Sequence, residues 1–344
     1  MAKFKIYKLH FKAPLHISDL REDASISQKT IHSDTLHAAL IACLAKAGKV
    51  PDNGDLGCTI SDLFPYYQKD QDSDAIYFLP MPFQARLPQL SNPSDAKKVK
   101  KVQWVDASLY SQLLHGKSFF SGNSDDLELI QASYLTKTPL PEDAAGSKEF
   151  IKSEVMQRVT VKDRTGQTDA KPYYVDRISF RDEAGLYFLV LGNDTSKLDE
   201  ALRILEMEGI GTDRYVGYGF FETITKDSKG NSLVLKIDTP EKADHQVALS
   251  MFVPESEEQL KRLMDSDRVA YDFTRRGGWI TTYPYITLRK NVVYAFLPGS
   301  VFRRTEDYDV IGRMVDLTPT IEGKRIDHTI WRNGKSIMLP IILK

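Results

Sequence analysis

Alternating hydrophobic and polar positions open the chain and predict a strand. Residues 3–11 place Phe4, Ile6, Lys8 and His10 on one face and Lys5, Tyr7, Leu9 and Phe11 on the other. Both faces carry apolar side chains, so this imperfect alternation is typical of a central strand. Residues 12–32 follow as a loop.

Helical spacing begins after that loop. Ser33 is the predicted N-cap and Asp34 lies in the first turn, where a negative charge favours a helix. The helix is expected to end at Gly48. Its apolar stripe consists of Leu36, Leu40, Cys43, Leu44 and Ala47.

A similar succession of strands and helices is predicted further along the chain. Residues 75–79 predict a second strand, and residues 80–148 are expected to be irregular insertions. Residues 185–191 then predict a buried strand, residues 196–207 a helix with Leu198, Leu202 and Leu205 at helical spacing, and residues 220–225 another strand.

This order favours an α+β fold with two ferredoxin-like (RRM-like) domains. Residues 1–226 form a βαββαβ domain with long insertions, and the polar stretch 226–232 marks the boundary. The second domain, 227–344, is expected to be incomplete and β-rich. Its predicted elements are strands at 233–237 and 247–253, a helix opened by a capping box at Ser256 and ending at Met264, and apolar runs at 286–288, 292–297, 314–317 and 337–343.

A glycine-rich loop at 209–222 stands between the helix and the last strand of the first domain. Gly209, Gly211, Gly217 and Gly219 bracket Arg214. A dinucleotide fingerprint must follow a strand and open a helix, so the observed order excludes that interpretation. A helix C-cap at Gly209 explains one or two glycines but not four.

The loop resembles the signature of the RAMP superfamily of CRISPR RNA-binding proteins. The pattern Gly-x-Gly-x-x-Arg-x-x-Gly-x-Gly, with Tyr218 inside it, precedes an aromatic strand. The sequence departs from the commoner pattern at Thr212 and Asp213, where a glycine and a lysine are frequent. The positive charge of the loop therefore falls to Arg214 alone.

Composition narrows the class of protein. The 344 residues are 42% hydrophobic and 27% charged, with a net charge of −1, which is typical of a soluble globular protein. Any nucleic-acid contact then requires basic patches, and residues 86–104, 152–181 and 268–290 supply local excesses of lysine and arginine. Two cysteines, a strand-like N-terminus and no long apolar run favour a cytoplasmic protein.

The segment 156–180 predicts a hairpin whose arms interleave basic and aromatic residues. Arg158, Lys162, Arg164 and Arg177 lie beside Tyr173 and Tyr174. Such strands can hold phosphates and stack bases, although an exposed hairpin with surface charges fits the composition nearly as well.

The sequence evidence for catalytic residues is weaker. His32 and His37 are five residues apart, which does not fit a zinc pair on one helix, so no metal or other cofactor is expected. His16 and His32 flank the loop before the first helix, and either can act as a general acid or base on an RNA 2′-OH. The alternative is that they hydrogen-bond RNA or local backbone.

The whole chain resembles one subunit family within the superfamily, which caps the 5′ end of CRISPR RNA (crRNA) in type III-A effector complexes. The motifs that carry this resemblance are 15–18, 31–36, 157–160, the glycine loop, 275–279, 299–302, 315–317 and 334–340. Ser18 stands where a glycine is usual. The resemblance implies a non-catalytic subunit that holds the repeat-derived 5′ handle and bridges the large polymerase-like subunit to the backbone RAMP subunits.

The resemblance also implies a set of RNA-facing residues. They are His16, Ser18, His32, Ser33, the hairpin around Arg158, the glycine loop, and the segment Arg275, Arg276, Gly277, Gly278 and Trp279. We expect the two domains to grip one RNA end jointly, with the 275–279 segment completing a cleft begun by the glycine loop; Trp279 as a core anchor is the alternative. A processing endoribonuclease and a purely structural subunit that touches no RNA are the other candidate functions.

Overall fold

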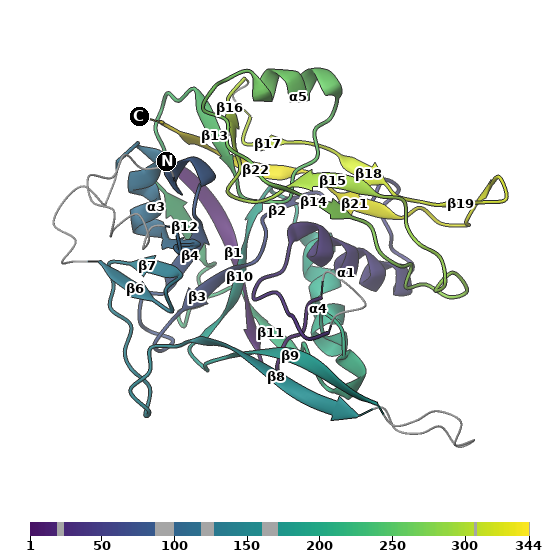
Figure 1. The fold of residues 1–344 in the computed structure, drawn as a ribbon, viewed down its shortest axis with the longest axis horizontal. Helices are drawn as coiled ribbons and strands as arrows, with labels where there is room; N and C mark the ends of the chain where they lie inside the picture. Colours follow the sequence, from purple (N-terminus) through teal and green to yellow (C-terminus); the bar gives the residue numbers. More distant parts are fainter. Residues whose placement is uncertain (19–23, 87–99, 118–126, 160–170, 306–307, 344) are drawn as a thin grey trace.

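The computed structural model describes residues 1–18, 24–86, 100–117, 127–159, 171–305 and 308–343 (Figure 1). It is an α+β protein built around one large sheet, with a smaller sheet and several two-stranded ribbons in the C-terminal part. No helix within these ranges is long and apolar enough to cross a membrane.

The large sheet has ten strands, eight of them in the order β11-β1-β10-β3-β4-β5-β7-β6, with β12 also pairing β1 and β2 also pairing β10. Their bounds are β1 Ala2–Phe11, β2 Thr59–Ile60, β3 Phe64–Tyr67, β4 Ile76–Pro80, β5 Trp104–Asp106, β6 Glu128–Ile130, β7 Tyr134–Thr136, β10 Ala184–Leu191, β11 Phe221–Ile224 and β12 Val234–Ile237.

The first strand is central, as its alternation predicts. It pairs antiparallel with β10 on one side and with β11 and β12 on the other.

Lys8 of this strand is buried. Its Nζ donates to Oε1 of Gln68 at 2.6 Å and lies over the Tyr66 ring. Burial lowers the pKa of Lys8 to about 8.

Two helices cover one face of this sheet. α1 spans Ser33–Lys46 and α4 spans Ser196–Glu208. The predicted stripes are buried, with Leu36, Leu40, Cys43 and Leu44 on α1 and Leu198, Leu202 and Leu205 on α4. These side chains share a core with Tyr7, Leu9 and Phe11 of β1. The order β11-β1-β10-β3, with α1 after β1 and α4 before β11, is the arrangement that a βαββαβ unit produces.

The predicted cap of α1 is wrong by one residue. The N-cap is His32, whose own side chain makes no capping hydrogen bond. Ser33 is instead the first helical residue, and its hydroxyl oxygen accepts a hydrogen bond from the backbone N–H of Met251, 218 residues away. The helix also ends two residues before the expected Gly48.

The prediction of irregular structure over 80–148 is also wrong in part. This segment contributes β5, β6 and β7, which extend the sheet, a 3₁₀ turn η1 at Phe83–Arg86, and the helix α3, Ala107–Leu114. Asp106 caps α3 by accepting hydrogen bonds from the backbone N–H groups of Ser108 and Leu109. The sequence signal was present, since Leu109, Tyr110, Leu113 and Leu114 share one helical face.

The hairpin prediction is confirmed for its two arms. β8, Ile151–Val159, pairs antiparallel with β9, Pro172–Phe180, as a separate ribbon below the sheet in Figure 1. Residues 160–170, including Lys162 and Arg164, lie outside the described residues.

The C-terminal part contains a four-stranded sheet in the order β16-β13-β22-β17, the helix α5 and three ribbons. Ser256 caps α5, as predicted, by accepting from the backbone of Gln259. The apolar run 286–288 forms no strand, and Ile286 is exposed. The remaining bounds are β13 His245–Ala248, α5 Glu257–Met264, β14 Phe273–Arg276, β15 Val293–Phe296, β16 Val301–Arg303, β17 Val310–Ile311, β18 Met314–Asp316, β19 Thr320–Ile321, β20 Lys324–Arg325, β21 Trp331–Asn333 and β22 Ser336–Ile341.

The two parts are packed together through a shared core. Because β12 pairs β1, the large sheet continues to Ile237, beyond the expected boundary at residue 226. Its second face, with Phe4 and Ile6, packs in one cluster with residues of α3 and with Val247, Ile337 and Leu339 of the smaller sheet.

Candidate RNA interface

The glycine loop is folded onto itself at its two ends. α4 ends at Gly209, whose φ is 74°, and the N–H of Ile210 donates to the carbonyl of Gly219 at 2.9 Å. A Cβ on Gly219 would overlap the Ile210 carbonyl, and one on Gly209 would lie 3.1 Å from the Tyr218 carbonyl. These two glycines are therefore required by close backbone contact.

The segment 14–18 holds the loop from the other side. The N–H of Gly219 donates to the Pro14 carbonyl at 2.8 Å, and the N–H of Thr212 donates to the His16 carbonyl at 3.0 Å. A Cβ on Gly211 would lie 2.5 Å from that same His16 oxygen. Packing thus explains a third glycine.

Gly217 differs from the other three. Its φ is 93°, yet a Cβ placed on it would meet nothing within 4 Å. It caps the single turn η3, Arg214–Val216, on which Tyr215 is fully exposed and Val216 is 62% exposed. The open part of the loop is therefore this turn, and Tyr215 is a candidate contact that the sequence pattern did not single out.

The β8–β9 ribbon docks against the same loop. Nη1 of Arg158 donates to Oδ2 of Asp213 at 2.7 Å, and its guanidinium lies 5.0 Å from the centre of the Tyr218 ring. Asp213 is one of the two residues at which the sequence departs from the commoner pattern of the loop. Here it orients Arg158 rather than contributing a second positive charge.

The ribbon also pairs with the segment that follows β1. Leu15 and Ile178 exchange two backbone hydrogen bonds of 2.8 Å, and Nδ1 of His16 lies 2.6 Å from the carbonyl of Asp176. His16 is 3% exposed, so its ring belongs to this joint and does not present a surface group. Ser18 is half-buried at the end of the same segment.

These contacts bring three predicted elements to one place. We call the surface formed by the β8–β9 ribbon, segment 14–18 and the turn η3 the loop–ribbon surface. Its charged side chains are partly engaged, because Arg177 pairs with Glu154 at 2.6 Å and Arg214 lies 3.8 Å from Glu208.

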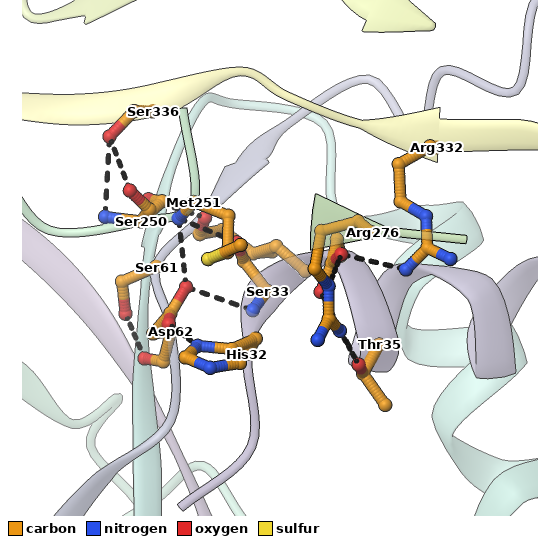
Figure 2. A network of polar contacts seen from close by, with 12 residues as sticks. His32, Ser33, Thr35, Ser61, Asp62, Ser250, Met251, Arg276, Arg332 and Ser336 are labelled. Atoms are coloured by element: carbon orange, nitrogen blue, oxygen red, sulfur yellow. Dashed lines mark hydrogen bonds and ion pairs between the residues drawn. The ribbon is translucent and has the colours of Figure 1, made fainter. Parts of the chain in front are cut away.

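A second group of predicted residues gathers at the N-terminus of α1 (Figure 2). Nδ1 of His32 lies 2.6 Å from Oδ2 of Asp62. Oδ1 of Asp62 accepts from the backbone N–H of Ser33 at 2.9 Å and from that of Met251 at 3.0 Å. Asp62 thus joins the large sheet, α1 and the C-terminal part.

Charge at this joint is balanced by ion pairs. Burial by itself lowers the pKa of His32, but the carboxylate of Asp62 outweighs burial and the net pKa is raised. Asp34 is fully buried and receives Arg276 at 2.7 and 2.9 Å and Arg332 at 2.7 Å. These guanidiniums outweigh the effect of burial and hold the pKa of Asp34 well below its usual range.

The segment 275–279 is therefore divided between two roles. Arg276 points into the joint and also donates to the Thr35 hydroxyl at 2.8 Å, and the Gly277 carbonyl accepts from Arg332 at 3.0 Å. Arg275 is exposed, and Gly278 has open space around it with φ at 104°. Trp279 is half-buried and stacks with Arg289, whose guanidinium is 4.8 Å from the ring centre.

The segment 275–279 and the glycine loop make their contacts with different parts of the fold. Arg276 and Gly277 bond to α1 and β21, whereas the glycine loop bonds to segment 14–18 and to the ribbon. Asp62 and Arg332 are residues that the sequence analysis did not single out, and it identified Asp34 only as a favourable charge in the first turn of a helix.

Comparisons with known proteins give the chain its relatives. Residues 241–341 match the family described as the CRISPR Csm4 C-terminal domain. A curated relative from Mycobacterium tuberculosis, "CRISPR system Cms protein Csm4", is 27% identical over 291 residues, covering 82% of this chain and 84% of the relative. A second protein of that name, from Methanocaldococcus jannaschii, is 22% identical over 307 residues, covering 77% and 78%.

Solved structures agree with these relatives. A chain of the crystal structure of the Csm3–Csm4 subcomplex in the type III-A CRISPR-Cas interference complex matches with a TM-score of 0.61 at 20% identity, covering 98% of this chain and 99% of that chain. A chain of the Csm1–Csm4 cassette in complex with pppApA matches with a TM-score of 0.55 at 19% identity, covering 100% and 99%. By sequence and fold together, this chain is similar to Csm4 proteins of type III-A CRISPR systems.

Proposed function

We propose that this chain is the non-catalytic subunit of a type III-A CRISPR effector complex that holds the repeat-derived 5′ handle of crRNA. Its Csm4 relatives support the assignment to the complex. Solved structures of the same fold include a Csm3–Csm4 subcomplex and a Csm1–Csm4 cassette. We infer that this chain likewise contacts a backbone RAMP subunit and the large subunit.

The observation that carries the RNA-binding part is the docking of the ribbon on the glycine loop through Arg158, Asp213 and Tyr218. This contact fixes an arginine and an aromatic ring beside the open turn at Gly217. Tyr215, on the same turn, exposes its whole ring to solvent. A cation, stacking surfaces and a turn without side-chain bulk are the groups that hold single-stranded RNA.

The proposal retains two ferredoxin-like units. The first is the βαββαβ arrangement around β1, and the second is the smaller sheet with α5. Since β12 belongs to the large sheet and the matched C-terminal domain begins at residue 241, we place the division between Ile237 and His245.

Binding of the handle is the first test. Fluorescence anisotropy with the purified full chain should show tighter binding to RNA that carries the handle than to RNA of equal length without it. Tyr215→Ala should weaken binding about tenfold, since stacking contributes about 1–3 kcal/mol per base. Tyr308→Ala is the matched control, because Tyr308 is 63% exposed and lies just before β17 of the smaller sheet. Equal affinity for both RNAs, unaffected by Tyr215→Ala, would overturn the proposed handle site.

Cleavage is the second test, because a processing endoribonuclease is the alternative. We expect labelled repeat RNA to remain intact with and without divalent metal. His16 is buried in a backbone hydrogen bond, and His32 is bound to Asp62. Cleavage at one defined position, abolished by His32→Ala, would replace the proposal with the endoribonuclease.

A further inference from the structure

The β14–β15 ribbon has one face turned into the protein and one turned to solvent. In its register, Phe273 lies opposite Phe296 and Arg275 lies opposite Tyr294. The intervening residues face inward, since Ala295 packs with Met251 and Val253 and Arg276 binds Asp34. Side chains alternate across a strand, so Phe273, Arg275, Tyr294 and Phe296 share the outer face.

This outer face exposes aromatic rings that hold one another in place. Tyr271, Phe273 and Tyr294 are 48%, 53% and 60% exposed. The Phe273 ring meets Tyr294 at 5.9 Å and 76°, and the Tyr271 ring meets Phe296 at 5.3 Å and 89°. Phe296 in turn packs against Phe302 of the smaller sheet. We call Tyr271, Phe273, Arg275, Tyr294 and Phe296 the aromatic face.

Positive charge accompanies these rings. Residues 268–290 contain Arg268, Arg275, Arg276, Arg289 and Lys290 and a single acid, Asp272. Arg275 is exposed, and among the described residues its guanidinium lies in no ion pair. Lys290 stands beside Arg276 and Arg332, and burial together with these cations lowers its pKa to about 8.

We propose that the aromatic face is a platform on which single-stranded RNA stacks its bases, with Arg275 holding the backbone beside them. The inference rests on the proposed function and adds a second RNA-contacting region to the loop–ribbon surface. Aromatic rings on adjacent strands of an exposed sheet face are how sequence-tolerant RNA-binding sheets present stacking surfaces.

Charge decides between RNA and a protein as the occupant. Exposed apolar patches also mark protein interfaces, where rings and arginines are common. The exposed cations Arg268, Arg275 and Arg289 outnumber the one acid of this segment, Asp272, and so complement a polyanion, and the guanidinium of Arg275 on the face suits a phosphate. The edge-to-face contacts hold the rings in position before binding, which reduces the entropy lost on stacking.

The test separates ring chemistry from hydrophobicity. A short single-stranded RNA of mixed sequence, labelled with fluorescein, is titrated against the full chain and the double variant Phe273→Leu/Tyr294→Leu. Leucine keeps an apolar surface but removes the π face, so the double variant should bind about tenfold or more weakly. Tyr308→Leu should bind as the wild type does. Arg275→Ala, whose side chain is exposed, supplies a second variant should the double variant fail to fold.

Photo-crosslinking with 4-thiouridine in the same RNA gives an independent measurement. Crosslinks should map to peptides that contain Phe273 or Tyr294. If the wild type binds no RNA, the proposed function fails and this inference fails with it. If the wild type binds but the double variant and Arg275→Ala bind equally well, only the aromatic face is overturned. Loss of assembly with sibling subunits at unchanged RNA affinity would identify the face as a protein-docking surface and also overturn the inference.

Discussion

The glycine loop and the segment 275–279 each present an arginine next to glycines, yet the structure uses the two arginines in opposite ways. Arg214 has a side chain that is 37% exposed, and its nearest carboxylate, Glu208, is 3.8 Å away. Arg276 has a side chain that is 11% exposed and bonds Asp34 at 2.7 Å. One arginine is available to a ligand, and the other joins two parts of the fold.

The difference lies in the partners rather than in the local motif. Glu208 already pairs with Lys46 at 2.6 Å, which leaves Arg214 weakly held. Asp34 is buried and has no water to solvate it, so it requires both Arg276 and Arg332. A glycine-flanked arginine therefore indicates a binding site only where its carboxylate neighbours are exposed or already occupied.

The largest expected effect comes from removing the buried carboxylate that pairs with Arg276. Asp34→Ala leaves two guanidiniums without their carboxylate in the interior and should lower the free energy of unfolding by about 3–5 kcal/mol. Asp265→Ala removes a carboxylate that is 72% exposed from its pair with Arg303 and should cost less than about 1 kcal/mol. Urea denaturation of both variants measures the contrast. Equal losses would contradict the role given to Asp34.

The next effect concerns the exposed glycine of the loop, Gly217. Gly217→Val and Gly230→Val both place a β-branched residue at positive φ, 93° and 83°, with nothing within 4 Å of the new Cβ. Their folding costs should therefore be similar. Only Gly217→Val should weaken handle RNA binding, by about tenfold, because only Gly217 lies on the loop–ribbon surface. Similar RNA affinities for the two variants would remove Gly217 from the interface.

The smallest effect concerns pH at the joint. The folded pKa of His32 is raised above 6.5, so the stability from its pairing with Asp62 is fully present below about pH 6.5 and is lost as pH rises through the folded pKa. Asp34 and Arg276 also act on this ring. His32→Gln should abolish this loss.

The neighbouring His37 does not interfere with that measurement. It is buried, which lowers its pKa to about 4, so its contribution is present above pH 6.5 and is lost as pH falls toward 4. Of these two histidines, only His32 therefore affects urea midpoints measured from pH 6.5 upward. Lys8 and Lys290, whose pKa values are lowered to about 8, act in the opposite direction at higher pH, so the contribution of His32 is the difference between the wild type and His32→Gln. A difference that does not change from pH 6.5 upward would contradict the raised pKa.

Sequence patterns predicted most of what depends on local spacing. The centrality of β1, the buried stripes of α1 and α4, the β8–β9 arms and the cap of α5 all follow from periodicity or from residues three or four apart. The α3 helix was missed although its apolar face has the right spacing, because the basic and proline-rich residues before it dominate the composition of that segment.

The candidate site was predictable as a set of segments but not as a set of contacts. The pair of Arg276 and Asp34 joins residues 242 apart, and that of Arg158 and Asp213 joins residues 55 apart. No periodic pattern records such partners. Likewise, four glycines read alike in the sequence, and only the surrounding backbone separates Gly217 from the three that packing requires.

The measurement that tests the account most directly pairs Arg214→Ala with Arg276→Ala, each assayed for unfolding free energy and for handle RNA affinity across a salt series. Arg214→Ala should keep nearly wild-type stability, bind RNA more weakly and reduce the slope of log affinity against log salt by about one. Arg276→Ala should lower the free energy of unfolding by about 3 kcal/mol. Its folded fraction should keep the wild-type affinity for RNA. Unchanged RNA binding by Arg214→Ala, together with weakened binding by folded Arg276→Ala, would contradict the division between an RNA surface and a structural joint.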